Sequence, residues 1–209
     1  MIDTKGLSTI KASKYFDFET LYKKGKRMKL LIASDIHGSA YWTKKLVDVF
    51  TNGDYDKLVI LGDVLYHGPR NDLPKEYAPK KVIEMLNNLK DKIICVQGNC
   101  DAEVDQMVLD FDVSSKHTVL VTEENTFYLT HGHHPYPTNL EKGTILLTGH
   151  THIPLYEMIG ENKDILHINP GSISIPKGGF PSSYVRFDGS KFSFFDFEGT
   201  KLEIEGQER

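Results

Sequence analysis

Five short polar motifs occur along this 209-residue sequence, each directly after a run of apolar residues. They are Asp35-Ile36-His37, Gly62-Asp63, Gly98-Asn99, His131-Gly132-His133 and Gly149-His150-Thr151-His152. The apolar runs, at 30–33, 58–61, 93–96, 127–130 and 145–148, have the character of buried strands. Ligands bind in loops at the carboxyl ends of strands in open α/β sheets. We therefore expect the five loops to meet at one shared site.

The side chains of these loops are suited to divalent metal ions. Imidazole and carboxylate groups bind Mn, Fe, Zn or Ni, and the one soft ligand nearby is the thiol of Cys100. Seven candidate ligands are too many for one tetrahedral ion, and they fit two ions that share a bridging carboxylate. The candidates are Asp35, His37, Asp63, Asn99, His131, His150 and His152.

Each motif on its own has a plainer explanation. A single Asp-x-His is more often a surface turn than a ligand pair, and Gly62-Asp63 or Gly98-Asn99 alone is typical of a turn. Alternate residues of an extended chain also point to opposite sides, so both ligands of one motif converge only if the backbone bends. The flanking Gly38 and Gly149 permit such a bend. The complete set, in this order at strand ends, favours the metal site.

The elements that position these loops follow from the apolar periodicity. Ser39 can cap a helix over 40–52, Gly53 ends it, and 79–89 has the apolar stripe of a second helix. Strands at 30–33, 57–61 and 93–96 alternate with these helices, which predicts parallel pairing. Further short strands are expected at 118–121, 127–130, 145–148, 165–169, 184–187, 192–197 and 202–204. The second half should therefore be strand-rich and partly antiparallel.

Composition bounds the class of protein. With 39% hydrophobic and 26% charged residues, the chain has the composition of a soluble globular protein. We expect a single domain over 28–209, and residues 1–27 as an N-terminal leader outside the fold, with a short helix near 16–24 considered. The net charge of −4 argues against stable nucleic-acid binding.

Cysteine content and hydropathy bear on location. Cys95 and Cys100 offer no disulfide framework, so a reducing, cytoplasmic compartment is expected. No apolar run approaches the roughly 18 residues of a membrane span, and we expect no membrane partner. The basic end of the leader lacks an apolar stretch before a cleavage site, so no signal peptide is expected.

In its motifs the sequence resembles the calcineurin-like metallophosphoesterases. The resemblance covers 28 to the C-terminus, and it is strongest with the small bacterial YfcE-type phosphodiesterases. The stretches that carry it are Ala33–Gly38, Leu61–Leu65, His67–Asn71, Gly98–Asp101, Asn169–Ser172 and Ser174–Gly179. The fold it implies is α/β, a four-layer α-β-β-α sandwich of two mixed sheets.

The resemblance also implies a metal arrangement. The first ion would be held by Asp35, His37, Asp63 and His152, and the second by Asp63, Asn99, His131 and His150. Asp63 would bridge the two divalent ions, for which Mn²⁺ is preferred and Fe, Zn, Ni or Co are alternatives. Such a pair activates a water against a phosphate ester. The expected function is hydrolysis of a phosphodiester bond in a small substrate.

Several alternatives stay open at this point. A phosphomonoesterase or protein phosphatase is a second enzymatic interpretation, and a non-catalytic metal-binding scaffold is a third. A missing ligand would favour the scaffold, but all seven positions are filled. A homo-oligomer is compatible with the sequence.

Three further residues are candidates for contacts to the phosphate or leaving group. Many members of the wider family have a histidine where this chain has Cys100, and that histidine is implicated in protonating the leaving group. A thiol of ordinary pKa is a poor substitute, although the YfcE-type subgroup shares the cysteine. His67 and Arg70 are the other two candidates, with loop stabilisation as the alternative role. Of His133 and His134, one is expected to line the pocket.

Overall fold

The computed structural model of the chain describes residues 27–207. Nearly all of the expected leader, including the helix considered near 16–24, lies outside the described residues. None of the helices within 27–207 is long and apolar enough to cross a membrane.

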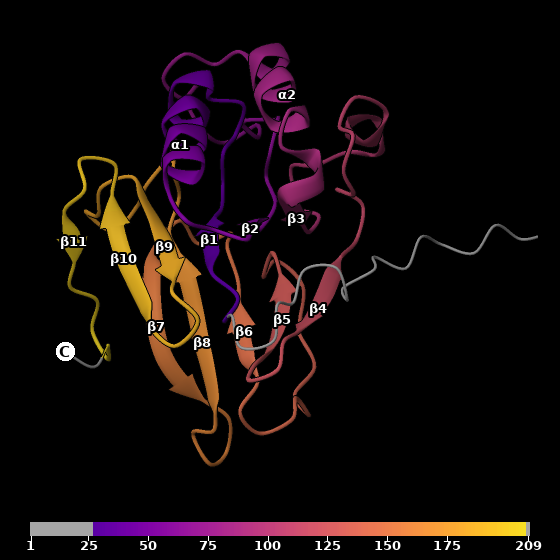
Figure 1. Cartoon of the computed structure of the whole chain (residues 1–209). Helices are drawn as coiled ribbons and strands as arrows, with labels where there is room; N and C mark the ends of the chain where they lie inside the picture. The colour runs from indigo at the N-terminus through magenta and orange to yellow at the C-terminus, as the bar shows by residue number, and fades with distance from the viewer. Residues whose placement is uncertain (1–26, 208–209) are drawn as a thin grey trace, which may run out of the picture.

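The fold is built on two mixed sheets (Figure 1). The first has six strands in the order β11-β10-β9-β1-β2-β3, and the second has five in the order β4-β5-β6-β8-β7. The first sheet comprises β1 Leu30–Ala33, β2 Lys57–Ile60, β3 Ile93–Cys95, β9 Ser183–Phe187, β10 Phe192–Asp196 and β11 Lys201–Leu202. The second comprises β4 His117–Val121, β5 Thr126–Thr130, β6 Ile145–Leu147, β7 Pro154–Ile159 and β8 Ile165–Pro170.

The strands that precede the polar motifs are parallel within each sheet. In the first sheet β1, β2 and β3 are parallel, and in the second β5 and β6 are parallel. The antiparallel strands lie outside these, with β9 beside β1 and β4 beside β5. This confirms the expected parallel first half and the partly antiparallel second half. The carboxyl ends of the motif-bearing strands are thereby free to meet at one edge.

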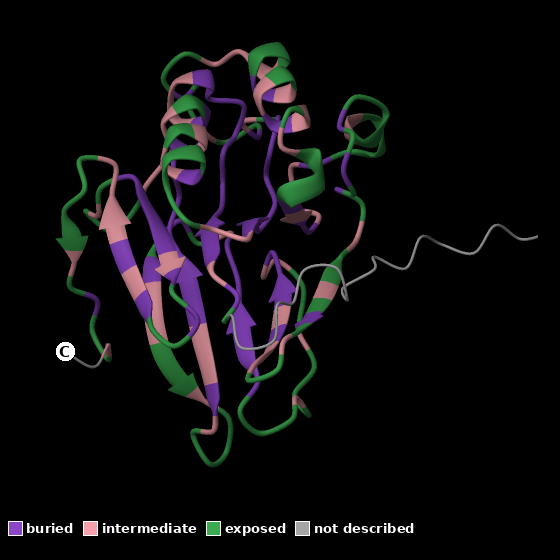
Figure 2. Ribbon diagram, in the orientation of Figure 1, coloured by how far each residue is buried: buried purple, intermediate pink, exposed green. Residues whose placement is uncertain are grey.

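Alternation along β1 divides the core into two layers. Leu31 and Ala33 face α1 Ala40–Asn52 and α2 Pro79–Asn87, whereas Leu30 and Ile32 face the second sheet. Every residue of β1 is buried, because both faces of this sheet are covered (Figure 2). The strand is therefore a rigid base for the loop that follows it.

The helices begin where the sequence predicted. Ser39 caps α1, its hydroxyl accepting a hydrogen bond from the backbone N–H of Trp42 at 3.4 Å. The second helix ends at Asn87, and a 3₁₀ turn over Lys90–Lys92 follows. Both α-helices pack on the six-stranded sheet, so the helical layer found within 27–207 covers one side of the sandwich.

Three elements are absent from the sequence prediction. The 3₁₀ helices Lys90–Lys92 and Glu103–Met107 are too short to leave a periodic pattern. Strand β7 begins with Pro154 and contains Glu157, and its burial pattern does not alternate cleanly. A proline and exposed charge are tolerated there because β7 is the edge strand of its sheet.

Candidate metal centre

Backbone hydrogen bonds join the polar loops to one another. The N–H groups of Asp35 and His37 donate to the carbonyls of Gly62 at 3.2 Å and Asp63 at 2.8 Å. The loops of the second sheet are joined likewise, since Gly149 N donates to His131 O at 3.0 Å. His150 N crosses between sheets to the Asp35 carboxylate at 3.1 Å. The loops therefore form one connected platform.

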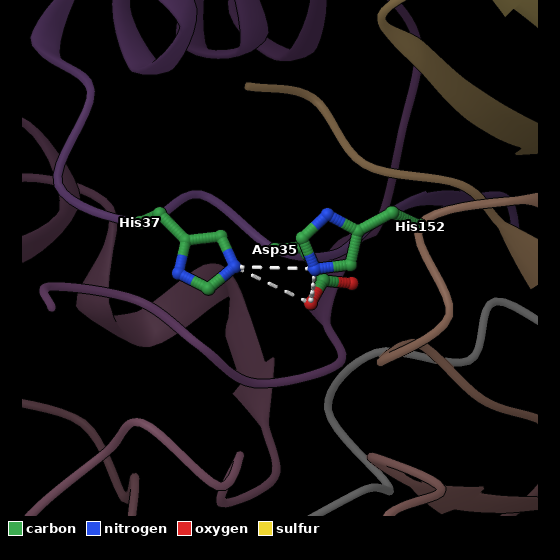
Figure 3. Close-up of side chains that lie close together, drawn as sticks. All are labelled: Asp35, His37 and His152. Atoms are coloured by element: carbon green, nitrogen blue, oxygen red, sulfur yellow. Dashed lines mark hydrogen bonds and ion pairs between the residues drawn. The ribbon is translucent and has the colours of Figure 1, made fainter. Parts of the chain in front are cut away.

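The expected ligands converge on this platform. Asp35 Oδ1 lies 3.2 Å from His152 Nε2 and 3.7 Å from His37 Nε2 (Figure 3). Asp63 Oδ2 lies 3.6 Å from His37 Nε2 and 3.5 Å from His131 Nε2. Asp63 is thus the carboxylate between two histidines that come from different sheets.

The two remaining candidates lie beside His131. Its Nε2 is 3.1 Å from Asn99 Oδ1, and its ring centroid is 5.2 Å from that of His150. Asn99 is exposed and His150 is half-buried, whereas Asp35, His37 and His131 are fully buried. The structure therefore brings all seven candidates to one place, buried on the Asp35 side and open on the Asn99 side.

The bend that lets neighbouring ligands converge is in the ligands themselves. Five of the seven have positive φ: Asp35 56°, His37 48°, Asp63 55°, His150 70° and His152 61°. Left-handed backbone is uncommon for such residues and costs of order 1 kcal/mol or more at each position. Strain gathered at one cluster of polar side chains is characteristic of a functional site.

Gly149 has a different role from the one expected of it. Its φ is not in the left-handed region, so a glycine is not needed there for conformation. Instead, a Cβ at this position would collide with the Ser34 hydroxyl and lie 3.0 Å from Asp35 Oδ2. The glycine is required because the two loops approach so closely.

The histidines point their lone pairs at the cluster. In each of three rings, Nδ1 lies within hydrogen-bond distance of a backbone carbonyl: His37 with Tyr66 O at 2.8 Å, His131 with Leu61 O at 2.6 Å and His152 with Ile175 O at 2.6 Å. A carbonyl only accepts, so Nδ1 carries the hydrogen and Nε2 of the neutral ring is an acceptor. Carbonyl partners of this kind orient histidine ligands in metal sites.

In the centre of the cluster, hydrogen-bond acceptors of the histidines and the carboxylates therefore face one another. Asp35 Oδ1 is buried and has no hydrogen-bond donor among the residues described. Three Nε2 lone pairs and two carboxylates at 3.2 to 3.7 Å from one another repel unless positive charge lies between them. The donor set of imidazole and carboxylate fits divalent transition metals.

The pKa values in the cluster have the same cause. Burial lowers the pKa of His131, but the neighbouring Asp63 carboxylate raises it by more, to about 9. Burial raises the pKa of Asp35, but His152 and His37 lower it by more, to well below the ordinary range. The cluster thus favours positive charge among its carboxylates, and a divalent cation satisfies the same demand.

Asp101 fixes the loop that carries Asp63, a role that its place in the Gly98–Asp101 stretch did not predict. Its Oδ2 accepts from the backbone N–H of Asp63 at 2.8 Å and of Gly98 at 2.7 Å, and its Oδ1 accepts from Val64 at 2.7 Å. Burial raises the pKa of Asp101 to about 6 despite these donors. The available signal was an aspartate three residues after a glycine at a strand end, which alone predicts a turn.

A cavity of about 520 Å³ opens over the cluster. Its wall contains five of the seven expected ligands together with Arg70, Cys100 and Lys177. Burial and the Asp63 carboxylate raise the pKa of the Cys100 thiol to about 12. Lys177, for which the Ser174–Gly179 stretch predicted no role, lies in the loop that follows β8.

The other predicted contacts do not line this cavity. The His67 ring packs edge-on against Tyr66 and Tyr77, at centroid distances of 4.7 and 5.2 Å, and does not line the cavity. The His133 and His134 rings are tilted against each other with centroids 4.0 Å apart, and neither ring is part of the cavity wall. Of the three predicted contacts to phosphate or leaving group, Arg70 and Cys100 line the cavity.

With this geometry, the sequence comparison identifies the class of protein. The domain of the calcineurin-like phosphoesterase superfamily matches residues 28–191, and the chain belongs to that family. It is 50% identical over 169 residues to phosphodiesterase YfcE of Escherichia coli strain K12, which covers 79% of this chain and 90% of that protein.

Two further relatives agree. The solved structure of YfcE from E. coli superimposes with a TM-score of 0.80 at 46% identity, over 84% of this chain and 97% of that chain. Phosphodiesterase MJ0936 of Methanocaldococcus jannaschii is 25% identical over 154 residues, which is 69% of this chain and 83% of that protein. The expected family and the two-sheet α/β fold are confirmed.

Proposed function

We propose that this protein is a metal-dependent phosphodiesterase that hydrolyses a small phosphodiester with water. The observation that carries the proposal is the meeting of three histidine Nε2 lone pairs with the Asp35 and Asp63 carboxylates beneath an open cavity. The relatives named phosphodiesterase, one of them 50% identical, support the same activity.

The seven expected ligands would hold two ions. Asp35, His37, Asp63 and His152 would hold the first, and Asp63, Asn99, His131 and His150 the second. A bridging role for Asp63 is supported by its position at 3.6 Å from His37 and 3.5 Å from His131. We propose Mn²⁺ as the native metal, because nitrogen and oxygen ligands with open positions suit it.

Two divalent cations held there would supply Lewis acidity that polarises the phosphate and lowers the pKa of the attacking water. The residues of the chain then do the rest. Asp101 holds the Asp63 backbone, and the carbonyls behind His37, His131 and His152 keep the three rings in their acceptor tautomer.

The cavity wall supplies the contacts to substrate. Arg70 would contact a phosphate group of the substrate, for which a guanidinium group is well shaped. The neutral Cys100 thiol can donate only a weak hydrogen bond to the leaving oxygen. We propose that the leaving group departs largely as an anion. His67 is the less favoured contact because its ring packs against Tyr66 and Tyr77 and does not line the cavity.

The setting we propose is the cytoplasm, since Cys95 and Cys100 are both free thiols. The net charge of −4 supports small phosphoesters over nucleic acid as substrates.

The test is metal removal and restoration with an aryl diester, bis(p-nitrophenyl) phosphate. Stripped protein should be inactive, and Mn²⁺ should restore nitrophenolate release. Asp63→Asn should lose activity at least about 100-fold, because one change weakens both ion sites. Glu161→Gln, in the exposed β7–β8 turn, removes the same charge elsewhere and should behave as wild type. Full activity in stripped protein or in Asp63→Asn would refute the proposal.

A further inference from the structure

Two cations in the cavity wall are not needed to build the metal cluster. Arg70 and Lys177 are exposed, and both line the cavity above the cluster. Within residues 27–207, neither side chain is paired with a carboxylate. The one carboxylate in the same wall, Asp63, lies beneath them among the histidines. The two positive charges are therefore available to a ligand.

Arg70 extends from a loop whose shape is fixed. Gly68 has a φ of 80°, and a Cβ at that position would lie 3.0 Å from Cys100 Sγ, so the loop packs directly on the Asn99–Cys100 turn. Asn71 closes the loop by donating from Nδ2 to His67 O at 2.8 Å. The base of the Arg70 side chain is thus held on the Cys100 side of the cavity.

Lys177 belongs to a segment fastened to a metal-cluster histidine. His152 donates from Nδ1 to Ile175 O, and Lys177 N donates to His152 O at 3.1 Å. The same segment turns back on itself through Phe180 N and Lys177 O at 3.2 Å. Lys177 is therefore held beside His152, and the two cations reach the same cavity from separate loops.

Charge balance indicates what these cations bind. Two divalent ions would bring four positive charges, and the Asp35 and Asp63 carboxylates would cancel two of them. Histidines that bind metal through Nε2 would be neutral, with Nδ1–H facing their carbonyl partners. The deprotonated attacking water and a singly charged diester would cancel the other two. The reacting centre is then neutral, and the charges of Arg70 and Lys177 have no counterpart in a simple diester.

We propose that Arg70 and Lys177 form a subsite for a second phosphate group of the substrate. The preferred substrates are then phosphodiesters that carry an additional phosphomonoester, such as a nucleotide phosphorylated at another position. A phosphate dianion supplies the two negative charges that balance this pair, and guanidinium and ammonium groups are its usual partners. The inference rests on the proposed phosphodiesterase function and specifies its substrate class.

The test is a matched pair of diesters. Thymidine 5′-(p-nitrophenyl phosphate) and its 3′-phosphorylated derivative share the scissile bond and leaving group, and water attack on phosphorus releases p-nitrophenolate from both. With the Mn²⁺ enzyme at constant ionic strength, kcat/KM should be about tenfold higher for the 3′-phosphorylated compound, mostly through KM.

Two variants and a control locate the effect. Lys177→Gln and Arg70→Gln should each remove most of the preference between the two diesters, while the rate on the unphosphorylated diester changes less. Lys80→Gln, exposed on α2 and outside the cavity wall, removes one positive charge elsewhere and should keep the preference. An equal loss on both diesters would mean that the cations contact the scissile phosphate, and the proposal would be wrong.

A binding measurement separates this inference from the proposed activity. Calorimetry on the Mn²⁺ protein should show thymidine 3′,5′-bisphosphate binding about tenfold tighter than thymidine 5′-monophosphate, with the difference lost in Lys177→Gln. If neither diester is hydrolysed, the phosphodiesterase proposal fails while this comparison still decides the subsite. Equal affinity for the two nucleotides in wild type would overturn the subsite.

Discussion

Substitution of Gly149 by alanine tests whether close approach of two loops builds the metal cluster. A Cβ at this position would collide with Ser34 Oγ and lie 3.0 Å from both Ser34 Cβ and Asp35 Oδ2. Its φ lies outside the left-handed region, so the backbone accepts alanine without strain. The effect of Gly149→Ala is therefore steric, and it acts between the first and second sheets.

The magnitude follows from the neighbours that must move. Overpacking of a buried site by one methyl group costs about 1–3 kcal/mol of folding free energy. Ser34 and Asp35 are fully buried and their side chains are hydrogen-bonded to backbone groups, so we expect a cost of about 3 kcal/mol. For a chain of this size that corresponds to a decrease in Tm of about 6–12 °C. Separation of the loops should also weaken Mn²⁺ binding, because His150 N donates to Asp35 at 3.1 Å.

A double-mutant cycle isolates the clash. Ser34→Ala removes the hydroxyl and its hydrogen bond to Leu61 O, at a cost of about 1 kcal/mol. In that background Gly149→Ala should cost less, by about 1–2 kcal/mol, because its closest neighbours then lie at 3.0 Å. Gly143→Ala is the comparison for conformation alone, since its φ is 83° and a Cβ there would meet nothing within 4 Å.

The assay is urea unfolding of all four proteins of the cycle, with Mn²⁺ titrations on each. Strict additivity of Ser34→Ala and Gly149→Ala would show that the loops do not clash through that hydroxyl, and the reasoning would fail. A loss in Gly149→Ala no larger than in Gly143→Ala would refute it as well.

Four further outcomes are expected. Asp101→Asn should weaken Mn²⁺ binding about 10- to 100-fold in calorimetry, because its amide nitrogen cannot accept from the loop N–H groups; unchanged affinity would remove Asp101 from the site. Cys100→Ala should retain most activity on aryl diesters, and rates in both proteins should fall steeply with rising leaving-group pKa; a flat wild-type dependence that turns steep in the variant would make the thiol the acid. We propose that residues 1–27 are dispensable, because the one described ion pair of Arg27 is exposed. A chain beginning at Met28 should therefore keep its Tm and specific activity. A large loss of either would contradict this. Burial raises the pKa of Asp112, but hydrogen bonds from Ser115 and Ser114 lower it by more. The contribution of this carboxylate to stability is therefore present above about pH 3.9 and is lost as the pH falls further. The midpoints of urea unfolding between pH 3 and 6 should accordingly depend less on pH in Asp112→Asn than in wild type.

The candidate ligands could be named from sequence because their signal is local. Asp35, Asp63 and His131 each follow an apolar run with the character of a buried strand, and such strands bring the residues that follow them to one edge of a sheet. The start of α1 was predictable for the same reason, since Ser39 and the apolar stripe after it are neighbours in the chain. Strand β7 was not, because an edge strand with a proline and exposed charge has no distinctive pattern.

What sequence could not specify are the contacts between segments far apart in the chain. The tautomer of His152 depends on a carbonyl 23 residues later, and the Asp63 loop is held by Asp101, 38 residues away. Lys177 enters the cavity wall only because its loop is fastened to His152. Local chemistry thus determined which residues can bind metal. Only the packing of the two sheets decided where their lone pairs point, how closely the loops approach and which cations lie above them, because each of these is set by pairs of atoms whose distance no local pattern encodes.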